Sequence, residues 1–159
     1  KTVRENLQVL CSKCNRSKGN KDDTDFRQFT PTEGDSECPF CSVQTRSRIV
    51  VELDSVFAVE DEFAVTPNHT LIIPFRHTED FFSMTSTERK DAEDLLRIMH
   101  NRITLLDSTV TGFNMGVNCG ESAGQSIFHA HIHLIPRREG DTPNPRGGVR
   151  GVIPERMSY

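Results

Sequence analysis

The sequence predicts an α+β domain, in which an antiparallel sheet of about five strands packs against one long amphipathic helix. Three observations lead to this prediction. Short apolar runs rich in β-branched residues are separated by turn residues, as in a meander of strands. One segment carries apolar side chains at the helical period, and another alternates apolar residues with histidines at the strand period. At 159 residues, the chain has the length of one ordinary domain with a small appendage.

The first three strands are expected at residues 48–53, 55–60 and 70–73. The first two are β-branched and aromatic runs separated by Asp54, so we expect them to be neighbours in the sheet. The third reads Thr-Leu-Ile-Ile. Pro74 should end it, because proline has no N–H to donate to a neighbouring strand.

Residues 86–107 are expected to form the long helix. Thr85 and Glu88 match a capping box, in which the threonine hydroxyl accepts from the backbone N–H of residue 88 and the glutamate reaches back to the N-cap backbone. The apolar stripe that follows must cover one face of the sheet. Its members are Ala92, Leu95, Leu96, Met99, Ile103 and Leu106.

A further strand, residues 111–117, leads into a glycine-rich turn at residues 120–124 and then into a histidine-bearing strand. There, His129, His131 and His133 alternate with Phe, Ala, Ile and Leu. On a strand, the apolar set faces a core, and the three imidazoles line the opposite face about 7 Å apart at each step. Because three charged imidazoles would repel one another, at least one is expected to stay neutral or to bind a metal ion.

This segment resembles the active-site motif of the histidine-triad (HIT) superfamily. The motif His-apolar-His-apolar-His-apolar-apolar is preceded here by Asn-Cys-Gly-Glu-Ser-Ala-Gly-Gln-Ser at residues 118–126. The segment 69–77, His-Thr-Leu-Ile-Ile-Pro-Phe-Arg-His, also resembles the upstream motif of that family, and together the match spans roughly residues 38–136. The resemblance implies a HIT-like fold and a homodimer with the long helix and a neighbouring strand at its interface.

The resemblance also implies a nucleotide phosphohydrolase that acts through a covalent nucleotidyl-histidine intermediate. His131, the middle histidine, would attack the α-phosphate, and water would then release a nucleoside monophosphate, expected to be AMP. His133 would hydrogen-bond the phosphate, and it favours hydrolysis because Gln at this position marks nucleotidyl transferases in the family. Ser126 would stabilise the bound phosphate or the leaving group. Dinucleoside polyphosphates, phosphoramidates and aminoacyl-adenylates are the substrate classes to expect.

Four further residues are candidates for substrate binding. Gly124 belongs to a turn whose backbone N–H groups can approach a phosphate closely, and Gln125 adds an amide donor. Asn118 matches an asparagine that the family uses near the phosphates. Asp61, eight residues before the upstream motif, matches an acidic residue that holds the ribose hydroxyls in many members. A plain turn residue is the alternative interpretation of Asp61.

The five cysteines include two Cys-x-x-Cys pairs, which favour metal binding over disulfides in a chain without a visible secretion signal. Zinc takes thiolates and imidazoles in a closed tetrahedral site when its role is structural. The resemblance to the zinc site of some bacterial HIT proteins and of related uridylyltransferases implies a Zn²⁺ site with four ligands. These are Cys38, Cys41, His77 and His129.

The other pair, Cys11 and Cys14, leaves a second arrangement open. With the later pair it would form a Cys₄ ribbon across a 23-residue gap. In the Cys₂His₂ arrangement, Cys11 and Cys14 would instead be left with a partial site. His69 and His100 are interpreted as structural or surface residues.

The remaining segments flank the HIT domain, which we place at residues 38–136. Residues 1–21 resemble the end of an HNH-like zinc module, through Asn-Leu-x-x-Leu-Cys-x-x-Cys-Asn, but lack the histidines of a nuclease. We interpret them as a remnant or arm, followed by an acidic, polar linker at residues 22–37. Residues 137–159, rich in proline and glycine, are expected to form an extended C-terminal tail.

The net charge of −4 argues against a broad nucleic-acid-binding surface. The basic residues in 1–21 still leave open a nucleic-acid partner, and with it an enzyme that removes adenylate from nucleic-acid ends. A zinc-stabilised nucleotide sensor is the other alternative. No apolar run approaches the ~20 residues of a membrane span, so we expect a cytoplasmic protein with no membrane partner. The resemblance to the HIT family implies a purine nucleotide substrate.

Overall fold

The structure, a computed structural model, describes residues 37–157. The predictions for residues 1–21 and for most of the linker therefore lie outside the described residues. The elements are the strands β1 (Val51–Glu52), β2 (Val56–Glu60), β3 (Thr70–Pro74), β4 (Val110–Gly116) and β5 (Ile132–Arg138), the α-helices α2 (Val43–Arg46) and α3 (Ser86–Leu106), and the 3-10 helices η4 (Pro39–Cys41), η5 (Glu121–Ala123), η6 (Gly148–Val152) and η7 (Pro154–Arg156).

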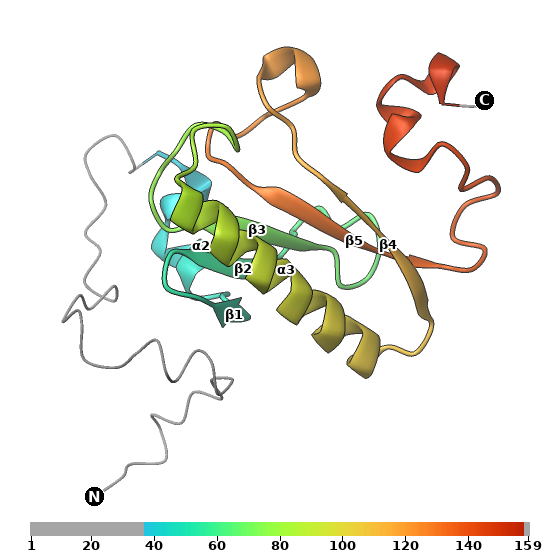
Figure 1. Cartoon of the computed structure of the whole chain (residues 1–159), viewed down its shortest axis with the longest axis horizontal. Coiled ribbons are helices and arrows are strands. Elements are labelled where there is room, and N and C mark those ends of the chain that lie inside the picture. Colours follow the sequence, from blue (N-terminus) through green and yellow to red (C-terminus); the bar gives the residue numbers. More distant parts are fainter. Residues whose placement is uncertain (1–36, 158–159) are drawn as a thin grey trace, which may run out of the picture. The chain divides into compact units, whose positions relative to one another are not determined.

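One antiparallel sheet runs in the order β1-β2-β3-β5-β4, which confirms the predicted α+β fold (Figure 1). β3 and β5 are the neighbours at its centre. His133 of β5 lies opposite Leu71 of β3 on one side and opposite Gly116 of β4 on the other. His133 is thus held between β5's two neighbours, β3 and β4.

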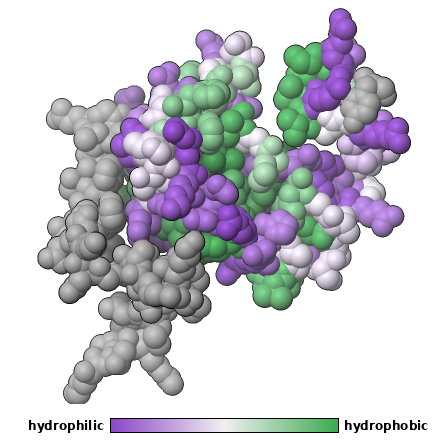
Figure 2. Space-filling view, viewed as in Figure 1, coloured by the Kyte–Doolittle hydropathy of each residue, from purple (hydrophilic) through white to green (hydrophobic). Residues whose placement is uncertain are grey.

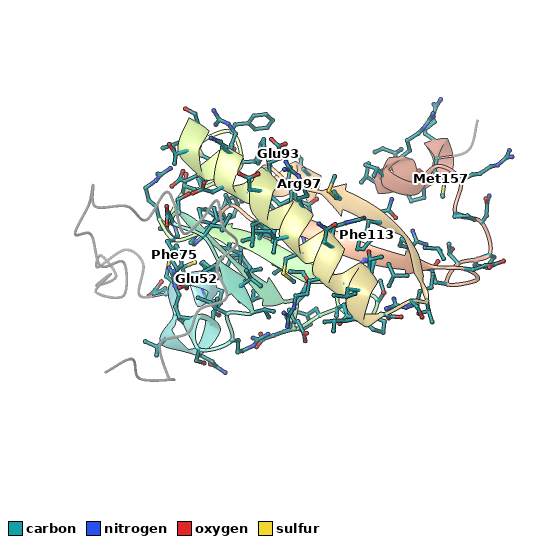
Figure 3. The ribbon with its side chains drawn as sticks, turned by 60° about the horizontal axis from the view of Figure 1, so that its bottom comes forward. Glu52, Phe75, Glu93, Arg97, Phe113 and Met157 are labelled. Carbon is teal, nitrogen blue, oxygen red and sulfur yellow. The ribbon has the colours of Figure 1, made fainter. Side chains whose placement is uncertain are left out.

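Helix α3 crosses one face of the sheet and begins at the predicted capping box (Figure 1). The Thr85 hydroxyl accepts from the backbone N–H of Glu88, and the Glu88 carboxylate accepts from the backbone N–H of Thr85. In Figure 3, Phe113 of β4 lies beside the helix, and it packs against the core between helix and sheet. The core between helix and sheet contains Val56, Ala58, Ile72, Met84, Ala92, Leu95, Met99, Ile103, Val110, Ala130, Ile132 and Leu134. No helix in the described part of the chain is both long and apolar enough to cross a membrane.

The opposite face of the sheet is covered at its β2–β3 end by the short segment that contains η4. Phe40, with the cysteines on either side of it, packs there on Phe57 and Ile73. Because both faces are covered here, four consecutive residues of β2 and all five of β3 are buried. This packing brings the Cys-x-x-Cys segment close to the histidines.

Several predicted details were wrong. β5 begins at Ile132, after two of the three histidines, and Phe128 is 47% exposed rather than in the core. The reason is that β3 ends at Pro74, so the backbone N–H of Ala130 donates to the Thr78 carbonyl in the following loop (2.7 Å) instead of to a strand. β1 is limited to two residues, Val51–Glu52.

The ends of two further segments also differ from expectation. Leu106 is the last residue of α3 and is 71% exposed, because the chain leaves the helix there toward β4. The C-terminal segment, expected to be extended, contains the 3-10 helices η6 and η7. Figure 2 shows hydrophobic surface both near the end of α3 and on the C-terminal segment. The exposed apolar residues in these places include Leu105, Leu106, Val149, Val152 and Ile153.

Candidate active site

The glycine-rich turn between β4 and β5 is shaped by two glycines with positive φ. Gly120 (φ 85°, ψ 159°) precedes η5, and Gly124 follows it in the left-handed conformation. The buried Gln125 side chain supports the turn: its Oε1 accepts from the backbone N–H of Gly120 (2.7 Å), and its Nε2 donates to the Glu79 carbonyl (2.6 Å). Asn118 Nδ2 donates to the Gly124 carbonyl (3.4 Å) across the turn.

Ser126, at the end of this turn, is exposed to solvent. Its hydroxyl thus lies on the surface of the segment that leads from the turn to the three histidines. Of the residues in and next to the turn predicted to bind phosphate, Gln125 is the one whose side chain is buried.

His129 is fully buried, and its two ring nitrogens have different partners. Nε2 lies 3.0 Å from the Pro74 carbonyl oxygen, which only accepts, so Nε2 carries the proton. Nδ1 then presents its lone pair to Cys38 Sγ at 3.4 Å and Cys41 Sγ at 3.5 Å. Burial lowers the pKa of His129 to about 4, and the nearby His77, Arg46 and His131 act in the same direction. The ring is therefore neutral at pH 7.

His131 is oriented by the backbone of its own segment. Its Nδ1 donates to the carbonyl oxygen of His129 at 2.7 Å, a contact that selects the tautomer with the lone pair on Nε2. The ring is buried and packs edge-on against Phe40, with centroids 5.1 Å apart, and against His133 at 5.2 Å. A neutral imidazole with a fixed tautomer and a free Nε2 lone pair is a nucleophile.

His133 contacts His69, a histidine that was expected to be a structural or surface residue. His133 Nδ1 lies 3.0 Å from Nε2 of the buried His69. Asp61 Oδ2 lies 3.4 Å from His69 Nδ1 and 3.9 Å from His133 Nδ1. Burial lowers the pKa of His133 to about 4, assisted by His131 and His69 and opposed by Asp61. Burial likewise lowers the pKa of His69, against the opposing charge of Asp61.

The sequence contained one signal that bears on His69: it opens the upstream motif, just before β3. Its partner follows from the register of the sheet. Leu71 lies opposite His133, so residue 69, two positions earlier on the same face, is a diagonal neighbour within reach of an imidazole. His100, the other histidine expected to be structural or on the surface, is exposed on α3 and contacts the Phe113 ring.

His129 also belongs to a second cluster of side chains. One ligand atom from each of the four predicted metal ligands, Cys38, Cys41, His77 and His129, lies within 4.8 Å of the others. Cys41 Sγ is 3.4 Å from His77 Nδ1. The turn at η4, closed by the Cys41 N–H bond to the Cys38 carbonyl (3.1 Å), brings the two cysteines of this cluster close together. Cys11 and Cys14 lie outside the described residues.

Comparison with known proteins agrees with this geometry. The HIT domain family matches residues 42–140. An uncharacterized HIT-like protein of Saccharolobus solfataricus is 32% identical over 108 residues, which cover 62% of this chain and 73% of that protein. The AP-4-A phosphorylase of Mycobacterium tuberculosis is 30% identical over 115 residues, which cover 70% of this chain and 57% of that protein.

Solved structures show the same fold. A HIT family protein from Bacillus anthracis superimposes with a TM-score of 0.61 at 35% identity, covering 67% of this chain and 77% of that one. A Zn-bound histidine triad family protein from Mycobacterium smegmatis superimposes with a TM-score of 0.60 at 25% identity, covering 73% of this chain and 90% of that one.

Proposed function

The chain belongs to the HIT domain family, and from this premise we propose that it is a nucleotide phosphohydrolase that cleaves its substrate at the α-phosphate. In the first step, His131 Nε2 forms a bond to the α-phosphorus, and the bond from phosphorus to the leaving group breaks. In the second step, water attacks the same phosphorus, the P–N bond breaks, and a nucleoside monophosphate leaves. The proposed product is AMP, from a dinucleoside polyphosphate, a phosphoramidate or an aminoacyl-adenylate.

The observation that carries this proposal is the 2.7 Å hydrogen bond from His131 Nδ1 to the His129 carbonyl oxygen. A neutral nucleophile suits an anionic phosphate, because the phosphate oxygens repel a negatively charged one. The hydrogen bond commits one ring nitrogen to the backbone and points the lone pair of the other away from it. It also stabilises the cationic imidazole that forms when Nε2 bonds to phosphorus.

The groups around His131 fit the charge of the substrate. We propose that His133 and Ser126 donate to the phosphate and the leaving group, together with backbone N–H groups of the turn around Gly124. Both ends of the Gln125 amide bond within the protein, so its proposed contribution is to hold the turn in shape. Asn118 braces the same turn.

Asp61 is the proposed partner of the ribose hydroxyls. Its Oδ1 accepts from the backbone N–H of Phe63 (2.9 Å), which fixes the carboxylate next to the histidine pair. That bond is also typical of a turn residue, so Asp61 shapes the loop while its second oxygen faces His69 and His133.

We propose that Cys38, Cys41, His77 and His129 hold a structural Zn²⁺. A tetrahedral zinc with its usual Zn–S and Zn–N bond lengths places S and N ligand atoms about 3.6 Å apart. The three S–N distances of 3.4–3.5 Å match this spacing. The Pro74 carbonyl, by accepting from His129 Nε2, fixes the tautomer that a zinc ligand requires. Zinc would hold the η4 segment against His129, and the similar Zn-bound structure from Mycobacterium smegmatis supports this assignment.

The activity is tested by incubating the 159-residue chain with adenosine phosphoramidate and with diadenosine tetraphosphate, and quantifying AMP. We expect wild type to release AMP and His131→Ala to lose at least about 1,000-fold in kcat. His100→Ala, which removes an exposed histidine far from the triad in the sequence, is the matched control and should retain full activity. If wild type and His131→Ala release AMP equally slowly, the protein is a nucleotide-binding sensor and the enzyme assignment is wrong.

The same assay separates hydrolysis from phosphorolysis, the reaction in the name of the Mycobacterium tuberculosis relative. Hydrolysis of diadenosine tetraphosphate gives AMP and ATP, whereas attack by inorganic phosphate gives ADP and ATP. We expect AMP and ATP with and without added phosphate. ADP that appears only with phosphate would assign the chain to the phosphorolytic class.

A homodimer is the proposed assembly. Among the described residues, β4 is an edge strand of the sheet and pairs with β5 alone. Its Met115 is exposed, as are Leu105 and Leu106 at the end of α3. We propose that a second copy covers these exposed apolar side chains of β4 and α3. The molar mass from light scattering should therefore be that of two chains.

A further inference from the structure

We propose that His69 is a positioning residue that fixes His133 in the tautomer with its proton on Nε2, so that His133 meets the phosphate as a neutral N–H donor. This inference deepens the proposed function and rests on it for its catalytic meaning. The tautomer itself is a property of the substrate-free protein and is tested without activity.

The starting observation is the 3.0 Å contact between His69 Nε2 and His133 Nδ1. At this distance, one nitrogen carries a proton and donates a hydrogen bond, and the other nitrogen accepts that hydrogen bond. If His69 donates, His133 Nδ1 is the acceptor and the proton of a neutral His133 is on Nε2. If His133 donates, its Nε2 is a bare lone pair. The second nitrogen of His69 decides between the two arrangements.

Two groups approach His69 Nδ1: one requires a lone pair on this nitrogen, and the other requires a proton. The backbone N–H of Val65 is directed at Nδ1 with an N–N distance of 3.4 Å, and an amide can only donate, so it requires a lone pair there. Asp61 Oδ2 is also 3.4 Å away, and a carboxylate can only accept. The Asp61 contact lacks the direction of a hydrogen bond, whereas the Val65 contact has it. The geometry therefore places the proton of His69 on Nε2, facing His133.

The chemistry of the site favours the same arrangement. A lone pair on His133 Nε2 would face the anionic oxygens of a phosphate and repel them, whereas an N–H group would donate to them. Burial lowers the pKa of His133 to about 4, so in the free protein the ring is neutral at pH 7 and does not become a donor on both nitrogens by protonation. The tautomer then decides whether His133 is able to donate.

This arrangement also leaves Asp61 available. When Val65 supplies the hydrogen bond to His69 Nδ1, one carboxylate oxygen of Asp61 accepts from the Phe63 N–H (2.9 Å), and the other is not required by His69. That oxygen remains an acceptor for a ribose hydroxyl. In the opposite arrangement, Asp61 would be committed to His69. The proposed roles of His69 and Asp61 are therefore compatible with each other.

The experiment is ¹⁵N–¹H spectroscopy of the full chain labelled at histidine, without substrate, at pH 8.5. The His133 signals are assigned by their absence in His133→Ala. In wild type, we expect a protonated Nε2 and an unprotonated Nδ1. The reverse pattern in wild type would overturn the proposal, whatever the activity of the protein.

An isosteric pair of variants tests the cause. His69→Gln retains an N–H donor, and we expect it to keep the wild-type pattern and a kcat within a few-fold of wild type. His69→Glu offers only an acceptor, and we expect it to move the His133 proton to Nδ1 and to lower kcat by about 100-fold or more. Thermal unfolding of both variants identifies any loss of the fold. An unchanged His133 pattern in folded His69→Glu would contradict the inference.

Asp61→Asn separates the two groups at His69 Nδ1. We expect the His133 tautomer to be unchanged in this variant, because Val65 and not Asp61 sets it. An inverted tautomer would show that Asp61 controls the pair and would overturn the assignment. Failure of the proposed function would appear instead as absence of AMP release from a wild type that has the expected tautomer, so the two failures are distinguishable.

Discussion

His129, His131 and His133 share one chemical group and differ in which ring nitrogen the protein occupies. The Pro74 carbonyl oxygen accepts a hydrogen bond from Nε2 of His129, and the His129 carbonyl oxygen accepts one from Nδ1 of His131. His69 occupies Nδ1 of His133. The alternation of the sequence identifies the three residues, but it contains no information on these partners. Each partner comes from the backbone path or from another strand, so the separate roles follow only from tertiary structure.

The lowered pKa of His133 predicts how stability depends on pH. Its ordinary value is 6.5, and burial lowers it to about 4 in the folded protein. Below pH 6.5, the unfolded chain binds a proton that folded His133 does not, so the free energy of unfolding falls as pH decreases toward 4. Between pH 7.5 and 5.5, this one group should contribute a loss of about 1 kcal/mol, allowing for its partial exposure.

Urea unfolding of wild type and His133→Gln at both pH values measures this contribution. The variant should lose about 1 kcal/mol less than wild type over the interval. His100→Gln, which changes an exposed histidine, should lose as much as wild type does. Equal losses in wild type and His133→Gln would show that the pKa of His133 is not depressed.

At the scale of elements, the sequence predicted correctly those features that depend on residues close to one another in the chain. The capping box and the apolar period of α3 predicted residues 86–107, and the helix is Ser86–Leu106. The start of β5 was predicted too early, because the alternation at residues 128–131 continues where the neighbouring strand has already ended at Pro74. Strand pairing depends on a partner distant in the sequence, and the period of a single segment does not show where that partner stops.

The turn before the histidines offers a prediction at this scale. Gly120 has φ 85° and ψ 159°, a conformation that is open essentially only to glycine, and its N–H donates to Gln125 Oε1. Gly120→Ala should lower the free energy of unfolding by about 1–3 kcal/mol. It should also lower kcat/KM for AMP release by at least about tenfold, because the N–H groups of the turn would no longer face the phosphate.

Urea unfolding and steady-state kinetics check these two effects. Gly151→Ala is the matched control, since a Cβ at that glycine meets nothing within 4 Å, and both quantities should stay at wild-type values. Wild-type kcat/KM in Gly120→Ala would remove the turn from the proposed phosphate site.

At the scale of the whole molecule, the sheet brings distant segments together. Cys38 and His129 are 91 residues apart and lie in contact, because η4 packs on the face of β2 and β3 that the segment before β5 also reaches. Cysteine spacing alone left a Cys₄ ribbon and a Cys₂His₂ site open. The resemblance pointed to the second, and its four ligand atoms lie within 4.8 Å of one another in the fold, which supports the proposed Cys₂His₂ site. Which face a short cysteine segment covers is a property of the packed domain, so the spacing could not decide it.

This long-range assembly leads to a prediction about metal content and stability. Purified wild-type chain should contain about one zinc ion that Cys38→Ser loses, because a tetrahedral site does not survive removal of one of its thiolates. Cys119→Ser, which changes a cysteine of the glycine-rich turn outside the cluster, should keep the ion. Since zinc binds the folded site, removing it with a chelator should lower the melting temperature of wild type and of Cys119→Ser, and leave Cys38→Ser unchanged. Elemental analysis and thermal unfolding measure both effects.

Cys11→Ser completes the test: retention of zinc supports the Cys₂His₂ site, whereas loss of zinc from both Cys11→Ser and Cys38→Ser would establish the Cys₄ ribbon instead.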